Sequence, residues 1–299
     1  MTSGADTLDW ERDGRDWPNR VASRFLAAGG LAWHVQVAGQ GPPLLLLHGT
    51  GASTHSFAEL LPLLSAHFTV IAPDLPGHGF TSLPPIEEQS LTGMSVAVAA
   101  LLRTLGFAPV IAVGHSAGAA ILVRMCLDSR LEPKVVISLN GALLPFPGVA
   151  GQMFPPLARL LFVNPFATRF FAWRAQDRSA VERLIRGTGS SIPASSLDIY
   201  ARLFGSDRHL TATLGMMANW DLPKLARDMP RLRVPLILVA CSEDAAIPPD
   251  TAIKVRDRVP SAVVEYRRGL GHLAHEERPN EIAEMILAVA RQKAMPAAQ

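Results

Sequence analysis

Gly114-His115-Ser116-Ala117-Gly118 matches the pattern G-x-S-x-G and lies between an apolar run, Val110–Val113, and a segment with helical spacing, Ala117–Leu127. Between a strand and a helix, this pattern is typical of a nucleophile elbow, a tight turn that exposes a serine hydroxyl above the edge of a sheet. The turn is so sharp that the residues two before and two after the serine must be small. A chance strand–glycine–helix junction is the alternative, but the flanking segments favour the elbow. We therefore predict that Ser116 is a catalytic nucleophile.

Apolar runs and helical segments alternate on both sides of this motif. The expected strands are 23–28, 31–37, 43–48, 69–72, 110–113, 135–139, 236–240 and 262–266, and the main expected helices are 57–66, 91–105, 117–127, 250–259 and 282–291. Continuous apolar strands between helices indicate a mostly parallel central sheet that is covered by helices on both faces. The alternation stops between about Leu143 and Trp220, where only helical patches occur. We therefore expect an α/β fold with a polar N-terminal leader (1–22), a core (23–142 and 221–294) and an inserted helical cap (143–220).

The composition excludes several classes of protein. The chain has 299 residues, of which 48% are hydrophobic and 18% charged, so it is not disordered, and its net charge of +2 argues against a nucleic-acid partner. Two stretches without charged residues, Phe25–Ala58 and Val135–Ala158, are interrupted by proline and glycine, which favours buried strands over membrane spans. The N-terminus lacks the apolar centre of a signal peptide. Two cysteines, Cys126 and Cys241, suggest a reducing, cytoplasmic setting, although one bridge between them stays open.

A serine nucleophile needs a base to accept its proton and an acid to orient that base. Asp244 follows the apolar run Leu236–Ala240, and His272 follows the run Ala262–Tyr266. Both positions lie at carboxyl ends of expected strands, where open α/β sheets place their sites. We therefore predict that Ser116, Asp244 and His272 form a catalytic triad.

Each partner has a rival nearby in the sequence. Glu243 adjoins Asp244, but on a tight loop its side chain should point elsewhere. His275 follows His272 by three residues, at the expected start of a helix, where it could face solvent or cap the helix. We prefer His272 because the neighbouring Gly269 and Gly271 free its loop to bring the imidazole to the serine.

The tetrahedral intermediate of acyl transfer needs two N–H donors for its oxyanion. We expect these to be the backbone groups of Ala117, which follows the nucleophile, and of Thr50, in the loop after the expected strand 43–48. His48 should lie under the site, and Asp74 should hold a loop below it. The candidates for contact with substrate are His48, Gly49, His115, Phe154, Phe170 and Met217. No metal-binding or nucleotide-binding motif is present, so we expect neither a metal nor a cofactor.

The expected cap is rich in arginine and in large apolar side chains. It has eight arginines and four acidic residues, whereas the rest of the chain has 20 cationic and 22 acidic residues. One interpretation is that apolar residues pack the cap onto the core while the arginines face water. A second is a broad apolar pocket with a cationic rim, suited to a large hydrophobic molecule that bears carboxylates. A third is peripheral contact with the inner membrane through residues 170–173.

Several motifs together resemble the α/β-hydrolase superfamily over residues 30–291. They are His48-Gly49-Thr50-Gly51, Asp74-Leu75-Pro76-Gly77-His78-Gly79, the elbow, Ser242–Pro248 and Gly269–Pro279. The resemblance implies the α/β-hydrolase fold with an inserted helical cap. More narrowly, Asp9–Arg20 and Leu44–Ser56 are similar to magnesium-chelatase accessory hydrolases of bacteriochlorophyll biosynthesis. This narrower resemblance implies a role near magnesium insertion into a porphyrin, a wide apolar ring that carries carboxylates.

Two functional hypotheses follow. The first is a serine hydrolase that cleaves a carboxylic ester or a related acyl bond, because a serine at position 116, rather than an aspartate, argues against dehalogenase or epoxide-hydrolase chemistry. The second is a non-catalytic accessory protein that binds a porphyrin or a magnesium-chelatase subunit through the cap. Fold alone does not decide between them.

Overall fold

The structure is a computed structural model that describes residues 7–145 and 177–293. Its centre is an eight-stranded sheet with the strand order β1-β2-β4-β3-β5-β6-β7-β8. The strands are β1 (Ser23–Ala28), β2 (Leu31–Ala38), β3 (Pro43–Leu47), β4 (Thr69–Pro73), β5 (Ile111–His115), β6 (Val135–Leu139), β7 (Leu236–Cys241) and β8 (Ala262–Arg267). The pairs β1–β2 and β2–β4 are antiparallel, and all other neighbours are parallel. The expected mostly parallel sheet is confirmed.

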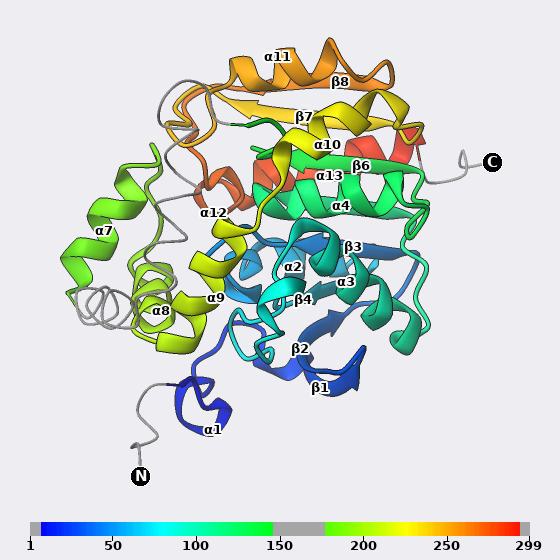
Figure 1. Cartoon of the computed structure of the whole chain (residues 1–299). Helices are drawn as coiled ribbons and strands as arrows, with labels where there is room; N and C mark the ends of the chain where they lie inside the picture. The colour runs from blue at the N-terminus through cyan, green and yellow to red at the C-terminus, as the bar shows by residue number, and fades with distance from the viewer. Residues whose placement is uncertain (1–6, 146–176, 294–299) are drawn as a thin grey trace.

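Helices cover both faces of this sheet (Figure 1). The helices of the core are α2 (Leu60–Ser65), α3 (Leu91–Leu105), α4 (Ala117–Leu127), α10 (Leu222–Asp228), α11 (Asp250–Arg256), α12 (Ala274–Glu277) and α13 (Pro279–Lys293), with 3-10 turns η2 (Thr54–Phe57), η3 (Ile86–Glu88) and η4 (Met229–Arg231). Helices α3, α4, α10 and α11 contribute to one buried apolar cluster, and α2 and α13 contribute to the cluster on the opposite face. The sheet is thus enclosed on both sides, as its continuous apolar strands predict.

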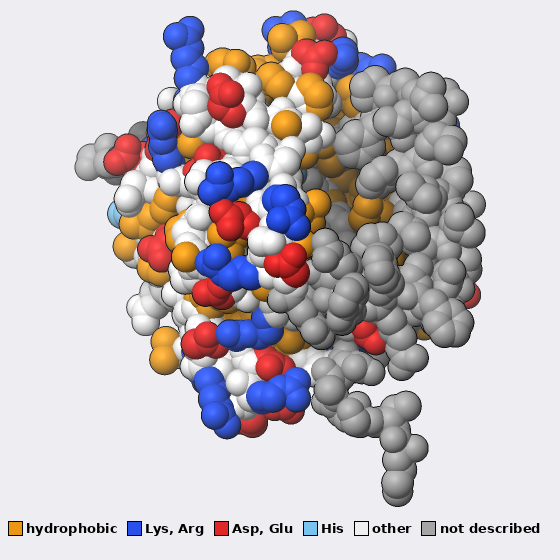
Figure 2. Space-filling model, turned by 90° about the vertical axis from the view of Figure 1, so that its left-hand side faces the viewer, with side chains coloured by type: hydrophobic (Ala, Val, Ile, Leu, Met, Phe, Trp, Pro, Cys, Tyr) orange, Lys and Arg blue, Asp and Glu red, His pale blue; other side chains and the backbone are white. Residues whose placement is uncertain are grey.

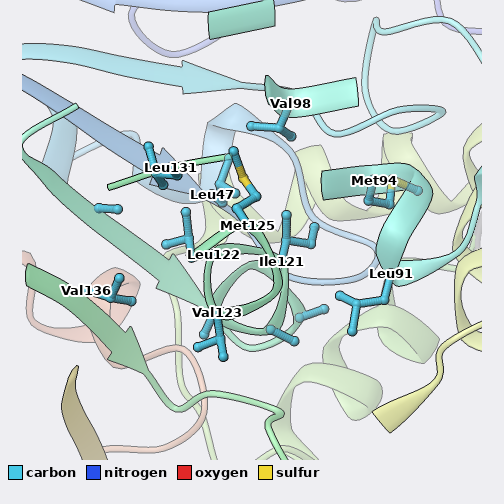
Figure 3. Packing of buried hydrophobic residues seen from close by; sticks show 14 of the residues in the cluster. Leu47, Leu91, Met94, Val98, Ile121, Leu122, Val123, Met125, Leu131 and Val136 are labelled. Carbon is cyan, nitrogen blue, oxygen red and sulfur yellow. The ribbon is translucent and has the colours of Figure 1, made fainter. Parts of the chain in front are cut away.

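Helix α4, which follows the elbow, is buried almost completely. Its apolar side chains Ile121, Leu122 and Met125 pack among Leu47 of β3 and Val136 of β6 (Figure 3). Because a helix that is apolar all round is stable only inside a protein, this composition fixes α4 against the sheet. The start of the helix, and with it Ser116, is therefore held by the core.

The described part of the expected cap, residues 177–220, is helical. It consists of α7 (Arg178–Arg186), α8 (Ala194–Phe204) and α9 (Asp207–Ala218), which lie near the carboxyl ends of the parallel strands (Figure 1). Asp177 caps α7 and Ser206 caps α9, each through its side-chain oxygen, as these residue types favour. Residues 146–176, which include Phe154 and Phe170, lie outside the described part of the chain.

The N-terminal leader packs against the cap and the core. After α1 (Trp10–Asp13) and before η1 (Arg20–Ala22), Trp17 is only 2% exposed, and its indole N–H donates to Thr54 Oγ1 over 3.0 Å. The Arg202 guanidinium on α8 forms a bidentate ion pair with Asp16, with N–O distances of 2.7 and 2.9 Å. The polar composition of residues 1–22 did not predict this burial of a tryptophan.

The charge-free stretches give no membrane span where they are described. Phe25–Ala58 contributes strands, turns and η2, and 135–145 contributes β6 and the loop after it. None of the described helices combines the length and the apolar character that crossing a bilayer requires. Cys126 and Cys241 are both free thiols, so the bridge that the sequence left open does not form.

Candidate active site

Ser116 occupies a strained turn between β5 and α4. Its φ of 51° and ψ of −115° lie outside the regions that ordinary side chains adopt, and strain of this kind costs about 1–3 kcal/mol. Two backbone hydrogen bonds hold the turn, because Ser116 N donates to Leu139 O over 3.0 Å and Ala142 N donates to Ser116 O over 3.1 Å. The predicted strand–turn–helix context is present, and the end of β6 together with the residues after it holds the strained turn in place.

The glycines of the motif are required by space. A Cβ on Gly118 would lie 2.3 Å from the Leu47 carbonyl oxygen, and one on Gly114 would lie 2.5 Å from the backbone nitrogen of Ala119. In the facing loop, a Cβ on Gly49 would lie 3.0 Å from Ser116 Cβ. The expectation that small residues flank the serine is confirmed, and the loop after β3 packs directly against it.

Asp244 and His272 form a buried hydrogen-bonded pair on the loops after β7 and β8. His272 Nδ1 lies 2.9 Å from Asp244 Oδ2, while Asp244 Oδ1 accepts hydrogen bonds from the backbone N–H groups of Ala246 and Ile247 over 2.9 and 2.8 Å. A carboxylate on Nδ1 keeps the proton there, so Nε2 retains the lone pair that a general base needs.

Ser116 and His272 line the same cavity. Among the described residues, no hydrogen bond joins Ser116 Oγ to the imidazole. Hydrogen bonds of this kind are often long without substrate and shorten when it binds. The arrangement is therefore compatible with proton transfer from the serine to His272 once the two side chains approach each other.

The rival residues are placed differently. Glu243 is exposed, and its carboxylate accepts a hydrogen bond from Ser242 Oγ over 2.9 Å. His275 is buried with its Nε2 2.8 Å from Ser56 Oγ, and burial lowers its pKa to about 3. Neither residue lines the cavity. The geometry therefore favours Asp244 and His272.

A second buried polar cluster lies behind the histidine loop. Glu276 accepts hydrogen bonds from Ser56 Oγ and, over 2.8 Å, from the Tyr200 hydroxyl on α8. Burial raises the pKa of Glu276 to about 7. Since the Tyr200 ring also lines the cavity, this cluster connects the cap to the helix that follows His272.

The two expected oxyanion donors are the backbone N–H groups of Thr50 and Ala117. Ala117 is the first residue of α4, so its N–H has no acceptor within the helix. Thr50 lies in the loop that contacts Ser116 through Gly49, and both Thr50 and Gly49 line the cavity. The two groups therefore flank the serine, and their role as an oxyanion hole is a proposal.

His48 supports this loop from below. It is fully buried, its Nδ1–H donates to Gly49 O over 2.8 Å, and its Nε2 accepts from Leu75 N over 2.9 Å. Both ring nitrogens are thus engaged with the backbone, and burial lowers the pKa of the imidazole. His48 is not among the residues that line the cavity, although we also predicted it as a candidate for substrate contact. It lies beneath the loop, which agrees with the predicted position under the site.

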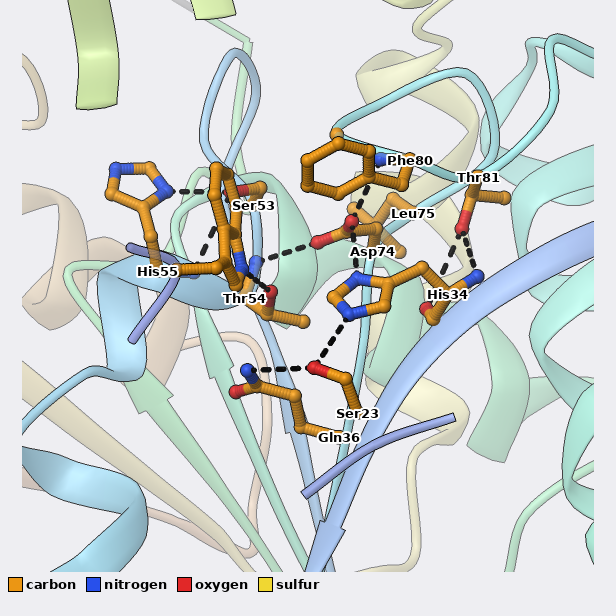
Figure 4. Close-up of polar contacts among 12 residues, drawn as sticks. Ser23, His34, Gln36, Ser53, Thr54, His55, Asp74, Leu75, Phe80 and Thr81 are labelled. Carbon is orange, nitrogen blue, oxygen red and sulfur yellow. Dashed lines mark hydrogen bonds and ion pairs between the residues drawn. The ribbon is translucent and has the colours of Figure 1, made fainter. Parts of the chain in front are cut away.

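Asp74 organises the next layer (Figure 4). Its Oδ1 accepts from Thr54 N over 2.7 Å, and its Oδ2 accepts from Phe80 N over 2.9 Å and lies 2.7 Å from His34 Nδ1. Burial alone would raise the pKa of Asp74, but the adjacent His34 and the N–H donors lower it below its usual value. The hydrogen bonds match the expected role of Asp74 in holding a loop.

His115, beside the nucleophile, contacts the loop of the proposed base. Its Nε2–H donates to the backbone carbonyl oxygen of His272 over 2.9 Å, and its ring centroid lies 4.7 Å from that of His272. Burial, together with the nearby His275 and His272, lowers the pKa of His115 well below its usual value. His115 therefore acts as a neutral support for the histidine loop and also lines the cavity.

Sequence reasoning missed two residues that hold the acid and base loops. Asn140, after β6, donates from Nδ2 to Asp244 Oδ2 over 2.7 Å and to Gly271 O over 3.3 Å. Thr188, after α7, accepts at its carbonyl from the backbone N–H groups of Ala245 and His272 over 3.1 and 3.4 Å. The rule that placed Asp244 and His272 at strand ends also applies to Asn140, whereas no local signal marks Thr188.

The cavity above Ser116 has a volume of about 610 Å³ and lies between the core and the cap. Three of the residues predicted to contact substrate, Gly49, His115 and Met217, line it, and their contact with substrate stays a prediction. Its lining includes Ala180, Val181, Leu184, Ile185, Tyr200, Phe204, Leu210 and Leu273. None of the described lining residues is Asp, Glu, Lys or Arg, so the cavity suits a mostly apolar, uncharged group.

The described cap arginines are engaged elsewhere. Four of them form ion pairs with carboxylates: Arg178 with Asp198, Arg183 with Asp177, Arg186 with Glu182 and Arg202 with Asp16. The fifth, Arg208, donates to the carbonyl oxygens of Thr81 and Gly79. Figure 2 shows the side of the molecule that carries α7 and α8, where Lys and Arg are interspersed with Asp and Glu. None of these five arginines lines the cavity. The remaining cap arginines and residues 170–173 lie outside the described residues.

Within residues 7–145 and 177–293, no group of three or more His, Cys, Asp or Glu side chains is arranged to hold a metal ion.

Comparison with known proteins identifies the family. The model of the alpha/beta hydrolase family matches residues 44–285. The chain belongs to the alpha/beta hydrolase family. Among the relatives of this hydrolase is the magnesium-chelatase 30 kDa subunit of Rhodobacter capsulatus, which is 38% identical over 278 residues, covering 91% of this chain and 95% of the relative. The pyrrolizixenacetamide deacetylase of Xenorhabdus hominickii is 28% identical over 268 residues, covering 82% of this chain and 89% of the relative.

Solved structures show the same fold for this hydrolase. An alpha/beta hydrolase fold protein from Burkholderia ambifaria has a TM-score of 0.76 at 21% identity, covering 89% of this chain and 97% of that one. An esterase from Exiguobacterium antarcticum has a TM-score of 0.73 at 18% identity, covering 89% and 98%. The expected α/β-hydrolase fold is therefore confirmed.

Proposed function

We propose that this member of the alpha/beta hydrolase family is a serine hydrolase that cleaves a carboxylic ester or a related acyl bond. The observation that carries the proposal is the buried hydrogen-bonded pair of Asp244 and His272, in which backbone N–H groups orient Asp244. His272 lines the same cavity as Ser116, whose backbone is strained. These are the three functional groups that nucleophilic acyl transfer requires.

In the proposed mechanism, Ser116 Oγ attacks the acyl carbon while His272 Nε2 accepts the hydroxyl proton. Asp244 stabilises the imidazolium, and the N–H groups of Thr50 and Ala117 stabilise the oxyanion. His272 then donates its proton to the leaving oxygen, which leaves an acyl group on Ser116. A water molecule deprotonated by His272 attacks this ester, releasing the carboxylic acid and regenerating the serine.

The cavity defines the class of substrate. Because its described lining is mostly apolar and contains no Asp, Glu, Lys or Arg, the part of the substrate that fills the cavity should be mostly apolar and uncharged as well. Burying an unpaired carboxylate there would cost several kcal/mol. We expect any carboxylates of the substrate to remain outside this lining.

We propose that the reaction belongs to bacteriochlorophyll biosynthesis, at or near the magnesium-chelatase step, and the name of the Rhodobacter capsulatus relative, a magnesium-chelatase subunit, supports this. A porphyrin ester would fit the cavity. Its ester group is neutral and its ring is apolar, as the lining requires, and its free carboxylates can stay at the mouth of the cavity. The second candidate is a non-catalytic accessory that binds a porphyrin or a chelatase subunit through the cap. The word subunit in the relative's name is the observation that favours it.

Labelling with a fluorophosphonate tests the nucleophile. We expect the natural chain to be labelled, the Ser116→Ala variant to be unlabelled, and Ser261→Ala, whose hydroxyl donates to Val234 O away from the site, to be labelled normally. Equal labelling of Ser116→Ala would contradict the proposed nucleophile.

Complementation separates the two candidates. In a bacteriochlorophyll-producing host that lacks its own copy of the protein, loss of pigment with Ser116→Ala supports catalysis. Pigment at the natural level with an unlabelled Ser116→Ala chain would leave the accessory role.

A further inference from the structure

The cap packs directly on the loop that carries Thr50, whose backbone N–H is one of the two proposed oxyanion donors. A Cβ on Gly51, the next residue, would lie 3.0 Å from the Phe204 ring and 3.5 Å from the methyl group of Thr213. Both of these cap residues also line the catalytic cavity above Ser116. The loop of the proposed oxyanion hole is therefore in contact with α8 and α9.

One side chain of α9, His209, binds this loop through a hydrogen bond. Its Nε2–H donates to the carbonyl oxygen of Gly51 over 3.0 Å, and its Nδ1 accepts from the backbone N–H of Gly79 over 3.0 Å. Only the neutral tautomer with its proton on Nε2 makes both bonds. Burial lowers the pKa of His209 to about 4, so the ring is neutral at pH 7. His209 thus joins the loop of Thr50 to the loop that follows β4.

The backbone of His209 is held in place by its own helix. The residue lies in the first turn of α9, which Ser206 caps through its side chain, and its carbonyl oxygen accepts from Thr213 Oγ1 over 2.8 Å. The preceding residue, Arg208, donates to the carbonyl oxygen of Gly79. The His209 side chain is fully buried. Because both its backbone and its ring are held, His209 can fix the Gly51 carbonyl in one position.

The N–H of Thr50 lies between two anchored carbonyl groups. The Gly49 carbonyl, which belongs to the same peptide group as this N–H, accepts from His48, and the Gly51 carbonyl accepts from His209. Since a peptide group is planar, anchoring the carbonyl groups on both sides of Thr50 restricts the direction of its N–H. This direction therefore depends on the core through His48 and on the cap through His209.

We propose that His209 is a positioning residue for the oxyanion hole: through the Gly51 carbonyl it directs the Thr50 N–H toward the oxygen that becomes negative when Ser116 attacks. The cap then takes part in catalysis in addition to enclosing the substrate. This inference rests on the proposed serine hydrolase function. A purely structural histidine would affect the transition state and the bound substrate alike, whereas a positioning residue of this kind affects the transition state more.

Two variants separate the two hydrogen bonds of His209. The amide nitrogen of glutamine can take the place of Nε2 and donate to Gly51 O, whereas the amide oxygen of asparagine can take the place of Nδ1 and accept from Gly79 N. Each variant keeps one bond and leaves one buried backbone group without its partner, so urea unfolding should show similar losses of stability.

Hydrolysis of 2-naphthyl acetate compares the two variants. We expect kcat to be at least about tenfold lower in His209→Asn than in His209→Gln, with similar KM values, because only the first loses the bond to the oxyanion loop. Equal kcat values would overturn the inference.

Inhibition by 2-trifluoroacetylnaphthalene measures the oxyanion site directly. Ser116 Oγ bonds to the ketone carbon, the hydroxyl proton passes to His272, and the electron pair of the C=O π bond moves to the oxygen, which becomes an oxyanion. We expect its Ki to be at least about tenfold higher in His209→Asn than in His209→Gln. The Ki of 2-acetylnaphthalene, which binds as a neutral ketone, should be the same in both. An equal rise for both ketones would show a purely structural role.

His67→Asn is the matched control, because it makes the same change at an exposed histidine after α2. It should leave kcat, KM and both Ki values unchanged. If neither His209 variant folds, the nitrogen NMR shifts of the His209 ring in the natural chain decide. A proton on Nε2 alone supports the inference, and a proton on Nδ1 would overturn it, because Gly79 N would then have no acceptor.

The natural chain distinguishes failure of this inference from failure of the proposed function. A natural chain that neither hydrolyses the ester nor reacts with the fluorophosphonate would overturn both. An active natural chain whose two His209 variants behave alike would overturn only the role of His209.

Discussion

Asn140 and His272 donate to the same oxygen of Asp244, over 2.7 and 2.9 Å. Since the other carboxylate oxygen accepts two backbone N–H groups, the four donors fix Asp244 in one rotamer. Asn140 holds this position with a φ of 49°, a left-handed conformation that asparagine tolerates better than most residues. The orientation of the proposed acid therefore depends on a residue that does not line the catalytic cavity.

Replacing Asn140 by aspartate should slow turnover about 5–150-fold. Aspartate tolerates the left-handed backbone, but it replaces the N–H donor beside Asp244 with an acceptor. The hydrogen bond that orients Asp244 is lost, and we expect this to raise the activation free energy by about 1–3 kcal/mol. Because two adjacent carboxylates share a proton, we also expect the acidic limb of the pH–rate profile to move to higher pH. Steady-state kinetics from pH 5 to 9 measure both effects.

Asn19→Asp is the matched control for this change. Asn19 is also left-handed, with a φ of 54°, and donates to the carbonyl oxygen of Ala58 over 2.9 Å, far from the acid loop. It should leave the pH–rate profile unchanged. A profile for Asn140→Asp that matches that of Asn19→Asp would show that Asn140 has no positioning role.

Asp244→Asn should preserve the fold and lower turnover about 10⁴-fold, because the amide no longer holds His272 in the tautomer with Nε2 free. Glu243→Gln, one residue away and exposed, should retain nearly full activity. Hydrolysis of a neutral apolar ester measures both variants. A reversed order of the two activities would identify Glu243 as the acid.

Gly118→Ala should destabilise the protein by about 3 kcal/mol or more, because its Cβ would lie within 2.7 Å of the carbonyl oxygens of both Leu47 and His48. Gly30→Ala provides the comparison. Its φ of 80° is strained for alanine, but its Cβ would meet no atom within 4 Å, so we expect a loss of only about 1–2 kcal/mol. Urea unfolding measures the difference between the two losses. Equal losses would mean that steric contact of the new Cβ with the Leu47 and His48 carbonyl oxygens is not what requires a glycine at position 118.

Stability should decrease steeply on acidification. Burial lowers the pKa of six histidines, His48, His55, His78, His115, His209 and His275, and three of these values are about 3 to 4. Because the unfolded chain binds these protons below about pH 6.5 and the folded chain does not, stability present above pH 6.5 is lost as the pH falls. Each histidine contributes up to about 1.4 kcal/mol per pH unit, so the free energy of unfolding should drop by several kcal/mol between pH 7.5 and 5.5.

Glu276 opposes this trend. Its pKa of about 7 lies above the unfolded value, so its contribution to stability is present below about pH 4.5 and is lost as the pH rises through 7. Glu276→Gln should therefore make the acid destabilisation steeper. Urea midpoints of the natural chain and of Glu276→Gln at pH 7.5, 6.5 and 5.5 test the effects of the histidines and of Glu276. Midpoints of the natural chain that do not change with pH would contradict the prediction that the buried histidines stay neutral in the folded state.

The sequence predicts the layers of this fold because its strands and helices carry local patterns. The helix predicted at Leu91–Leu105 has the bounds of α3, since Ser90 caps it and Gly106 ends it in the left-handed conformation. Strand-end reasoning likewise brings Asp244 and His272 together. The same reasoning does not predict the burial of Trp17 or the hydrogen bonds of the Thr188 carbonyl, because both depend on segments that are distant in the chain.

The Thr188 carbonyl couples the two loops that carry the proposed acid and base. It accepts one hydrogen bond from the loop of the proposed acid and one from the loop of the proposed base. Lifting this end of the cap would break both bonds and release both loops together. One carbonyl group thus ties the position of the acid loop to that of the base loop, so a displacement at Thr188 would be felt by both members of the pair.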